Sequence, residues 1–309
     1  MRLYKRKSGV LTKIKTVPFK LEKDIQTLVE SNMNEIFGLT FVTSEFKIGE
    51  FRIDSLCFDE ETQSFIIVEY KKGDSYSVID QGYSYLSKMI HNKSDFILEY
   101  NESMNKTLKR DDINWEESKV IFVSPSFNSY QKNSINFKDV PFELYEIKQY
   151  SNDTFSLNQH LSNSSESINK ISKGKNKIIE NVNNEVKVFT ESDYLNSLGE
   201  HLIEPFNKLK NKILELNDVE TRFRHIYMNF WVNGQVIVYL NRGKKYISVD
   251  ILSGSKNSFK LDDPNKYFTV WKKKSTGQDI YYHHLTDESD LDYVFMMIKQ
   301  KYESLIKND

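Results

Sequence analysis

The apolar segment FIIV at positions 65–68 is followed at once by Glu69, Tyr70 and Lys71. Its bulky and β-branched residues predict a buried strand over Phe65–Lys72. A carboxylate at the end of such a strand is costly unless it is paired or holds a metal ion. Alternate residues of a strand share one face, so Glu69 and Lys71 are expected to project together. The segment therefore predicts a sheet that carries an ionic site at one strand end.

A second predicted strand, Phe51–Phe58, precedes the first and contains Asp54. The short polar turn at 59–63 predicts a hairpin, which can bring Asp54 beside Glu69. Two adjacent carboxylates repel each other, and a divalent cation with oxygen ligands such as Mg²⁺ relieves that repulsion. The simpler alternative is an ordinary ion pair of Lys71 with either carboxylate, which contributes little energy when exposed.

The surrounding pattern indicates a mixed α/β domain over residues 1–150. Helical spacing of apolar residues predicts helices over Leu21–Phe37 and Ser77–His91. Apolar runs predict three further strands, at Asp95–Glu99, Lys119–Val123 and Phe142–Ile147.

Residues 151–178 are rich in Ser and Asn and predict a polar linker. Residues 179–309 then predict a second, smaller α+β domain. Its expected helices are Tyr194–Leu216 and Asp287–Leu305, and its expected strands are Gln235–Leu240, Lys245–Ile251 and Asp279–His283. A length of 309 residues also suits two domains.

The formal net charge of −1 gives no overall field that would attract a polyanion. Residues 1–23, however, hold eight Lys and Arg residues against the single acid Glu22. This basic arm can sit on phosphates, or it is a solvated terminus. The single cysteine, Cys57, cannot form an intramolecular disulfide, and no apolar segment predicts secretion or membrane insertion. A cytoplasmic protein is expected.

Asp54 and the Glu69-Tyr70-Lys71 segment, with a helix on either side along the chain, resemble the PD-(D/E)XK nuclease superfamily, which includes restriction endonucleases and RecB-like nucleases. The resemblance covers about residues 15–150. The motif's aspartate corresponds to Asp54, its acidic residue to Glu69 and its lysine to Lys71. Ile53 stands where the motif often has proline, which is a small departure.

Gln81 and Tyr85 form a Q-x-x-x-Y pattern on the predicted helix after the motif, and this is similar to an additional motif of RecB-type nucleases. Their spacing places both on one helical face, where Tyr85 can equally be a core residue. The resemblance also implies a glutamate on the first helix that faces the metal. Glu22 fits that position, with Glu30 and Glu35 as alternatives.

The C-terminal half resembles a small uncharacterised domain of so-called predicted transport proteins. The residues that carry this likeness are Lys245–Ile251, the turn at 261–264 and the segment 287–302. A transport role finds no support, because nothing in the sequence predicts a membrane span. Basic residues near the expected strand edges can contact phosphates or simply be solvated; they are Arg242, Lys244, Lys245, Lys272, Lys273 and Lys274.

Together the resemblance implies a restriction-endonuclease-like mixed sheet flanked by helices and Mg²⁺-dependent hydrolysis of DNA, in restriction, anti-phage defence or repair. Mn²⁺ can substitute for Mg²⁺. Asp54, Glu69 and Glu22 would hold the metal, Lys71 would serve the attacking water, and Gln81 and Tyr85 would support the site. The alternative is a non-catalytic module of the same fold that binds nucleic acid or protein. Cutting both strands favours a homodimer.

Overall fold

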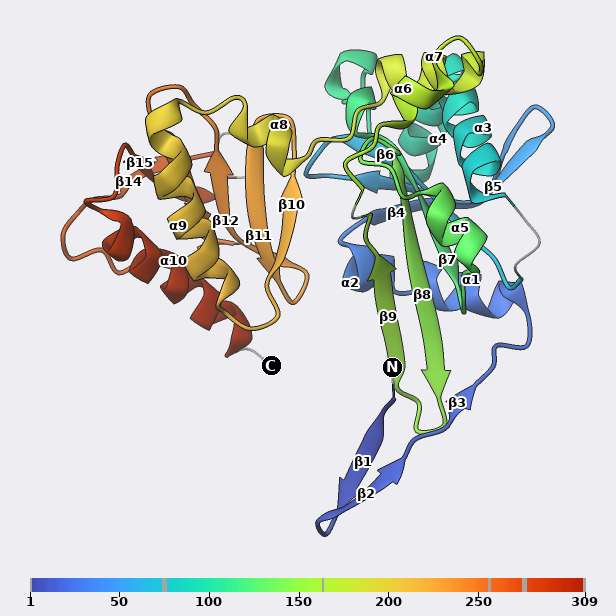
Figure 1. Ribbon diagram of the computed structural model, residues 1–309, viewed down its shortest axis with the longest axis horizontal. Coiled ribbons are helices and arrows are strands. Elements are labelled where there is room, and N and C mark those ends of the chain that lie inside the picture. Colours follow the sequence, from blue (N-terminus) through green and yellow to red (C-terminus); the bar gives the residue numbers. More distant parts are fainter. Residues whose placement is uncertain (1, 74–76, 163, 255–256, 274–276, 308–309) are drawn as a thin grey trace. The chain divides into compact units, whose positions relative to one another are not determined.

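The computed structural model describes residues 2–73, 77–162, 164–254, 257–273 and 277–307. The chain divides into two compact units, Met1–Val188 and Phe189–Asp309 (Figure 1). We refer to them as unit 1 and unit 2 and describe each by itself. No helix in the described part of the chain is both long and apolar enough to cross a membrane.

Unit 1 is built on a seven-stranded mixed sheet with the order β3-β8-β7-β6-β5-β4, in which β9 also pairs with β8. The strands β4, β5 and β6 are antiparallel, whereas β6, β7 and β8 run parallel. The bounds are β3 Thr16–Val17, β4 Thr40–Ile48, β5 Phe51–Asp59, β6 Ser64–Tyr70, β7 Lys119–Ser124, β8 Phe142–Tyr150 and β9 Phe155–His160.

Helices cover both faces of this sheet. One face packs on α1 (Glu22–Glu30) and α2 (Met33–Phe37) through Ile25, Val29 and Phe37. The other face packs on α3, α4 and α7. The remaining bounds are α3 Val78–His91, α4 Lys93–Met104, α5 Ser129–Ser134, α6 Ile168–Ser172 and α7 Lys177–Glu185, with short 3-10 turns at Arg110–Asp112 and Trp115–Glu117. The predicted mixed sheet flanked by helices is thus confirmed.

The basic N-terminus forms a separate two-stranded sheet of β1 (Tyr4–Lys7) and β2 (Val10–Lys13). Every residue of both strands is exposed. We call residues 2–15 the N-terminal arm. A lone hairpin is marginally stable in water, so the arm gains little from its own contacts.

The predicted linker at 151–178 is wrong, because the segment belongs to the fold of unit 1. Strand β9 lies within it and pairs with β8, and α6 and the start of α7 follow. The Asn176 side chain accepts hydrogen bonds from the first backbone amides of α7. Tyr83 of α3 and Asn183 of α7 then form a buried hydrogen bond of 3.2 Å. Ser and Asn therefore act here as caps and buried partners, and unit 1 extends to Val188 rather than to residue 150.

Two other predicted elements of unit 1 differ. The strand expected at Asp95–Glu99 is part of helix α4, where Phe96 and Tyr100 are buried one turn apart while Leu98 is exposed. The helix expected over Leu21–Phe37 breaks at residues 31–32, where the Ser31 and Asn32 side chains bond to carbonyls four residues earlier. Strand β4 was not predicted.

Unit 2 is an α+β unit with a six-stranded antiparallel sheet of order β10-β11-β12-β13-β15-β14. Helices α9 and α10 pack on one face of it. The bounds are α8 Glu191–Leu195, α9 Ile203–Leu214, α10 Leu291–Ile306, β10 Glu220–Phe223, β11 Tyr227–Val232, β12 Gln235–Asn241, β13 Ile247–Leu252, β14 Thr269–Lys272 and β15 Asp279–Leu285, with a 3-10 turn at Glu200–Leu202. The final helix starts later than predicted because residues 286–290 form a turn, in which Asp287 accepts a hydrogen bond from the Ser289 amide.

Candidate active site

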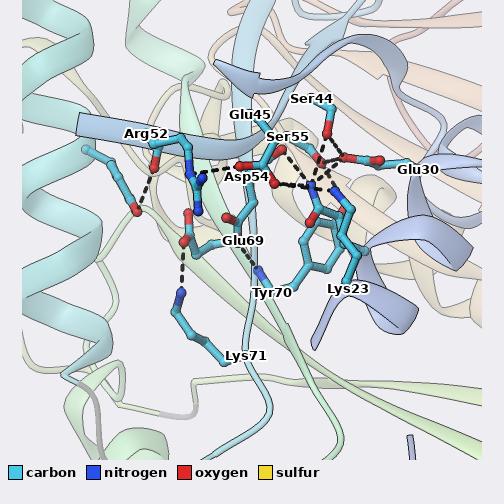
Figure 2. A network of polar contacts seen from close by, with 12 residues as sticks. Lys23, Glu30, Ser44, Glu45, Arg52, Asp54, Ser55, Glu69, Tyr70 and Lys71 are labelled. Carbon is cyan, nitrogen blue, oxygen red and sulfur yellow. Dashed lines mark hydrogen bonds and ion pairs between the residues drawn. The ribbon is translucent and has the colours of Figure 1, made fainter. Parts of the chain in front are cut away.

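The site lies where β5 and β6 separate. Their ladder ends at the pair Ser55 and Val68, so Asp54 and Glu69 are the next residues on each strand. In place of a further ladder bond, the Tyr70 amide donates 3.0 Å to Oδ2 of Asp54 (Figure 2). On its other side β6 stays paired with β7, and the Lys71 amide donates to the Val123 carbonyl. The divergence of two strands thus makes room for polar side chains in the sheet.

Glu69 is the buried centre of this site, with only 2% of its surface exposed. Its Oε1 forms a 2.8 Å ion pair with Nζ of Lys71, the residue that directly follows β6 (Figure 2). Its Oε2 is buried and has no hydrogen-bond partner among the described residues. One carboxylate oxygen is therefore neutralised, while the other is left in an environment that penalises charge.

The titration of both groups follows from this placement. Burial, with the Asp54 carboxylate nearby, raises the pKa of Glu69 to about 8, although Lys71 opposes the rise. Burial alone would lower the pKa of Lys71, but the charges of Glu69, Asp54 and Glu22 outweigh it and raise that pKa. Three carboxyl groups, those of Glu69, Asp54 and Glu22, therefore lie around a single lysine.

Helix α3 brings the Q-x-x-x-Y pair to the same carboxylate. Nε2 of Gln81 donates to Oε1 of Glu69 at 3.3 Å and to the Tyr85 hydroxyl at 3.0 Å. The Tyr85 hydroxyl lies 3.4 Å from the Arg52 carbonyl, and burial raises the pKa of Tyr85. Gln81 thus contacts the acid of the site rather than the lysine, and Tyr85 holds Gln81 while its ring is buried.

The close approach of α3 depends on Gly82. A Cβ at this position would lie 2.6 Å from the ring of Phe142 in β8. Only a residue without a side chain lets the helix come this near to the sheet.

Glu22, in the first turn of α1, lies at the end of β6 but on its exposed side. Its Oε2 accepts a 2.8 Å hydrogen bond from the Lys72 amide. No group of three His, Cys, Asp or Glu side chains arranged to hold a metal ion occurs in the described parts of the chain. Asp54 and Glu69 therefore form a pair, with Glu22 at its border.

A neighbouring polar network was not predicted. Glu30 accepts hydrogen bonds from Gln26, Ser44 and Ser55, the last at 2.7 Å. The buried Gln26 side chain also donates 3.0 Å to the Asp54 carbonyl. Glu30 thus holds strand β5 through its hydrogen bond with Ser55, the residue after Asp54. It does not lie in the position that was predicted for Glu22. The available signal was a polar residue, Gln26, inside the apolar stripe of a helix.

Unit 1 is thus a mixed α/β fold whose sheet holds two carboxylates and a lysine beside a helix with glutamine and tyrosine. No family model matches the chain. The chain is 39% identical over 304 residues to a protein of Haemophilus influenzae described as uncharacterised, and the match covers 97% of this chain and 99% of that one. The chain belongs to the same family as that protein.

A structural comparison found a repair endonuclease from Pyrococcus abyssi, with 17% sequence identity and a TM-score of 0.21. The match covers 38% of this chain and 43% of that one. A likeness of this extent is weak, so the fold class rests on the strand order and helix placement of unit 1.

Proposed function

We propose that the protein is a metal-dependent nuclease that hydrolyses phosphodiester bonds in DNA, in restriction, anti-phage defence or repair. The observation that carries the proposal is the Glu69 carboxylate. One of its oxygens is paired with Lys71, and the other is buried beside Asp54 without a hydrogen-bond partner among the described residues. Such an arrangement costs stability, which is typical of sites whose chemistry requires it.

The residues fit a divalent cation. A partnerless buried oxygen on Glu69 next to a second carboxylate is the oxygen-rich, negatively charged surrounding that Mg²⁺ or Mn²⁺ requires. Asp54 and Glu69 would be the ligands of the ion, and Glu22 would add negative charge at the border of the ion site. When bound, the ion supplies the positive charge that lowers the pKa of a water molecule and stabilises a phosphoryl oxygen.

The other side chains have roles that their contacts suggest. Lys71 is half-buried, remains protonated because its pKa is raised, and orients an attacking water through its N–H groups. Gln81 is a positioning residue, because it donates to Glu69 and is itself held by Tyr85. Both roles require the splayed end of β5 and β6, which leaves space beside the carboxylates.

A polyanionic substrate suits the N-terminal arm of the same unit. Residues 1–21 contain seven Lys and Arg residues and no acid. Every residue of β1 and β2 is exposed, so their cations are available to phosphates. DNA would thus supply the contacts that the arm lacks on its own.

The test is cleavage of supercoiled and linear DNA by the full chain with Mg²⁺ or Mn²⁺. Lys71→Ala and Asp54→Asn are expected to lower cleavage at least 100-fold, because each removes a group that acts on the water or its metal. Lys72→Ala is the matched control, since this neighbouring lysine is exposed and its Nζ donates to the Lys20 carbonyl. It is expected to cleave within about twofold of the wild type, where the effect of a surface change is small.

Cleavage that persists in EDTA, or that is unchanged in Lys71→Ala, would contradict the proposal. If the wild type binds DNA in gel shifts but does not cut it under any metal condition, the protein is a binding module built on this fold.

A further inference from the structure

The sheet of unit 2 has two different faces. The residues that point towards α9 and α10 form the core, for example Phe230, Leu240 and Val249. The alternate residues on the opposite face are absent from that core. One register row of this face crosses all six strands, and it consists of Arg222, Asn229, Tyr239, Asp250, Tyr282 and Thr269. We call this surface the aromatic face.

A second register row lies beside the first, towards the loop between β12 and β13. It places Tyr227, Asn241, Ser248 and His284 on neighbouring strands. Aromatic rings thus lie next to hydrogen-bonding side chains on this face of the sheet. A helix-backed sheet of this composition is a common platform for unstacked nucleic-acid bases.

The rings already contact one another. Tyr246 stacks on His284 with ring centroids 3.8 Å apart and an angle of 16°, and Tyr282 lies 5.4 Å from the same histidine. Tyr227 and Tyr239 meet edge to face at 5.2 Å. Tyr246 is 38% exposed, so a flat ligand can reach this end of the stack. Stacking on such rings is open to every base, because each base has a π-face.

Asp250 lies between Tyr239 and Tyr282 in the first row. Asn241 and Ser248 donate to its two oxygens at 2.9 and 2.6 Å. Burial raises the pKa of Asp250, and the hydrogen bonds from Ser248 and Asn241 partly offset the rise. Each oxygen keeps a second lone pair that can accept an N–H from the edge of a base held between the tyrosines.

Positive charge lies at one end of this face. Residues 221–249 contain five Lys and Arg residues and no acid. Four of them, Arg224, Arg242, Lys244 and Lys245, occur at the β10–β11 turn and the β12–β13 loop, and the Arg242 amide donates to the Ile226 carbonyl and so joins these two segments. This end suits phosphates, whereas Asp250 in the centre suits base edges. Of the other basic residues singled out in the sequence, Lys272 and Lys273 lie at the opposite end, and Lys274 is outside the described residues.

We propose that the aromatic face of unit 2 binds single-stranded DNA, with bases stacked on Tyr239, Tyr282 and the outer ring of the Tyr246–His284 stack, and with the backbone along the basic loops. The proposal rests on the proposed function in that it takes DNA as the substrate. It assigns to unit 2 the recognition of unpaired strands that unit 1 would cut.

The experiment measures binding of a fluorescent 20-nucleotide mixed-sequence DNA strand to the full chain in EDTA, so that cleavage plays no part. Tyr239→Leu and Tyr282→Leu are expected to weaken binding roughly tenfold each, and Tyr→Phe at the same positions to retain it within about threefold, because the ring remains. Tyr130→Leu is the matched control, because this tyrosine is 71% exposed on α5 of unit 1. Lys244→Ala with Lys245→Ala should lower the salt dependence of binding.

Binding unchanged in both leucine variants, or no binding by the wild type, would each overturn the proposal. Circular dichroism and thermal unfolding of each variant separate loss of binding from loss of folding. Because the measurement needs neither metal nor Lys71, its failure is independent of whether the protein cleaves DNA.

Discussion

Nζ of Lys71 lies 2.8 Å from Oε1 of Glu69, while Oε2 of the same carboxylate is buried without a hydrogen-bond partner in the described part of the chain. The ion pair therefore satisfies only half of the buried acid. The sheet could be more stable with a neutral or apolar residue at position 69, and this conflict between stability and charge can be measured.

Glu69→Gln is expected to stabilise unit 1 in the absence of metal, and increasingly so as the pH rises. The folded pKa of Glu69, about 8, lies above its ordinary value of 4.5, so the folded state holds the proton more tightly than the unfolded chain. The stability that this proton gives is complete below pH 4.5 and is lost as the pH rises to about 8. Each pKa unit corresponds to about 1.4 kcal/mol, so the advantage of glutamine grows by a few kcal/mol over this window.

Thermal unfolding of both proteins between pH 5 and pH 9 measures this difference. In a unit of this size, about 1 kcal/mol shifts Tm by roughly 2–4 °C. Glu30→Gln is a useful comparison, because Glu30 accepts three hydrogen bonds from neighbouring side chains and no charge-driven gain is expected. A Glu69→Gln protein that is less stable than the wild type at pH 9 would show that Lys71 fully compensates the acid.

Mn²⁺ or Mg²⁺ is expected to raise the Tm of the wild-type protein. Under the proposed function the ion would bind the folded pair of Asp54 and Glu69 and not the unfolded chain, so stabilisation would follow RT ln(1 + [L]/Kd), or about 2.7 kcal/mol at a hundredfold excess over Kd. The gain should increase with pH, because Glu69 must lose its proton to become a ligand. Asp54→Asn and Glu69→Gln should lose most of it.

Scanning calorimetry of the metal-free protein, repeated at several concentrations of Mn²⁺ or Mg²⁺, measures this shift in Tm without any need for activity. Equal shifts in the wild type and both variants would place metal binding elsewhere on the chain.

The site itself was largely predictable from local sequence. The apolar run before Glu69 fixed β6, and the spacing of Gln81 and Tyr85 put both on one side of α3. What no local pattern revealed was the separation of β5 and β6 beyond Ser55, because it depends on pairing between strands. The same holds for Glu30, whose partners Ser44 and Ser55 come from two different strands.

The fold was predicted less well where polar residues have structural roles. Strand β4 is half-exposed and its pairing with β5 shifts register, so it lacks a regular alternation of apolar residues. In α4, the run Phe96-Ile97-Leu98 suggests a strand, although the buried residues Phe96 and Tyr100 follow helical spacing and Leu98 is exposed. The Ser-rich and Asn-rich segment at 151–178 folds because its polar groups find partners, such as Asp139 accepting from Ser167 and Ile168. Such partners are distant in sequence.

Gly82→Ala is expected to destabilise unit 1 by roughly 1–3 kcal/mol, the usual cost of an oversized group in a packed core. The new Cβ would lie 2.6 Å from the Phe142 ring, so α3 or the ring must move. A shift of α3 also moves Gln81 away from Glu69, so cleavage should fall by more than the stability loss explains. Ser84→Ala, a half-buried change of similar size on the same helix, should leave both properties nearly unchanged. Chemical denaturation and cleavage assays of the two variants measure this, and an alanine at position 82 without effect would show that the ring adapts freely.

Replacing Lys5, Arg6, Lys7 and Lys13 of the N-terminal arm with glutamine is expected to weaken DNA binding and make it less sensitive to salt. Each phosphate contact releases about one counterion, so the slope of log K against log salt should fall by roughly one for each cation that touches DNA. Stability should hardly change, because every residue of β1 and β2 is exposed.

The control replaces four exposed lysines around α6 and α7, which are Lys170, Lys173, Lys175 and Lys177. Titrations of a short duplex at several salt concentrations compare the two proteins. Equal slopes for the arm variant and the control variant would mean that only the change in net charge affects binding. The arm would then not lie on the DNA.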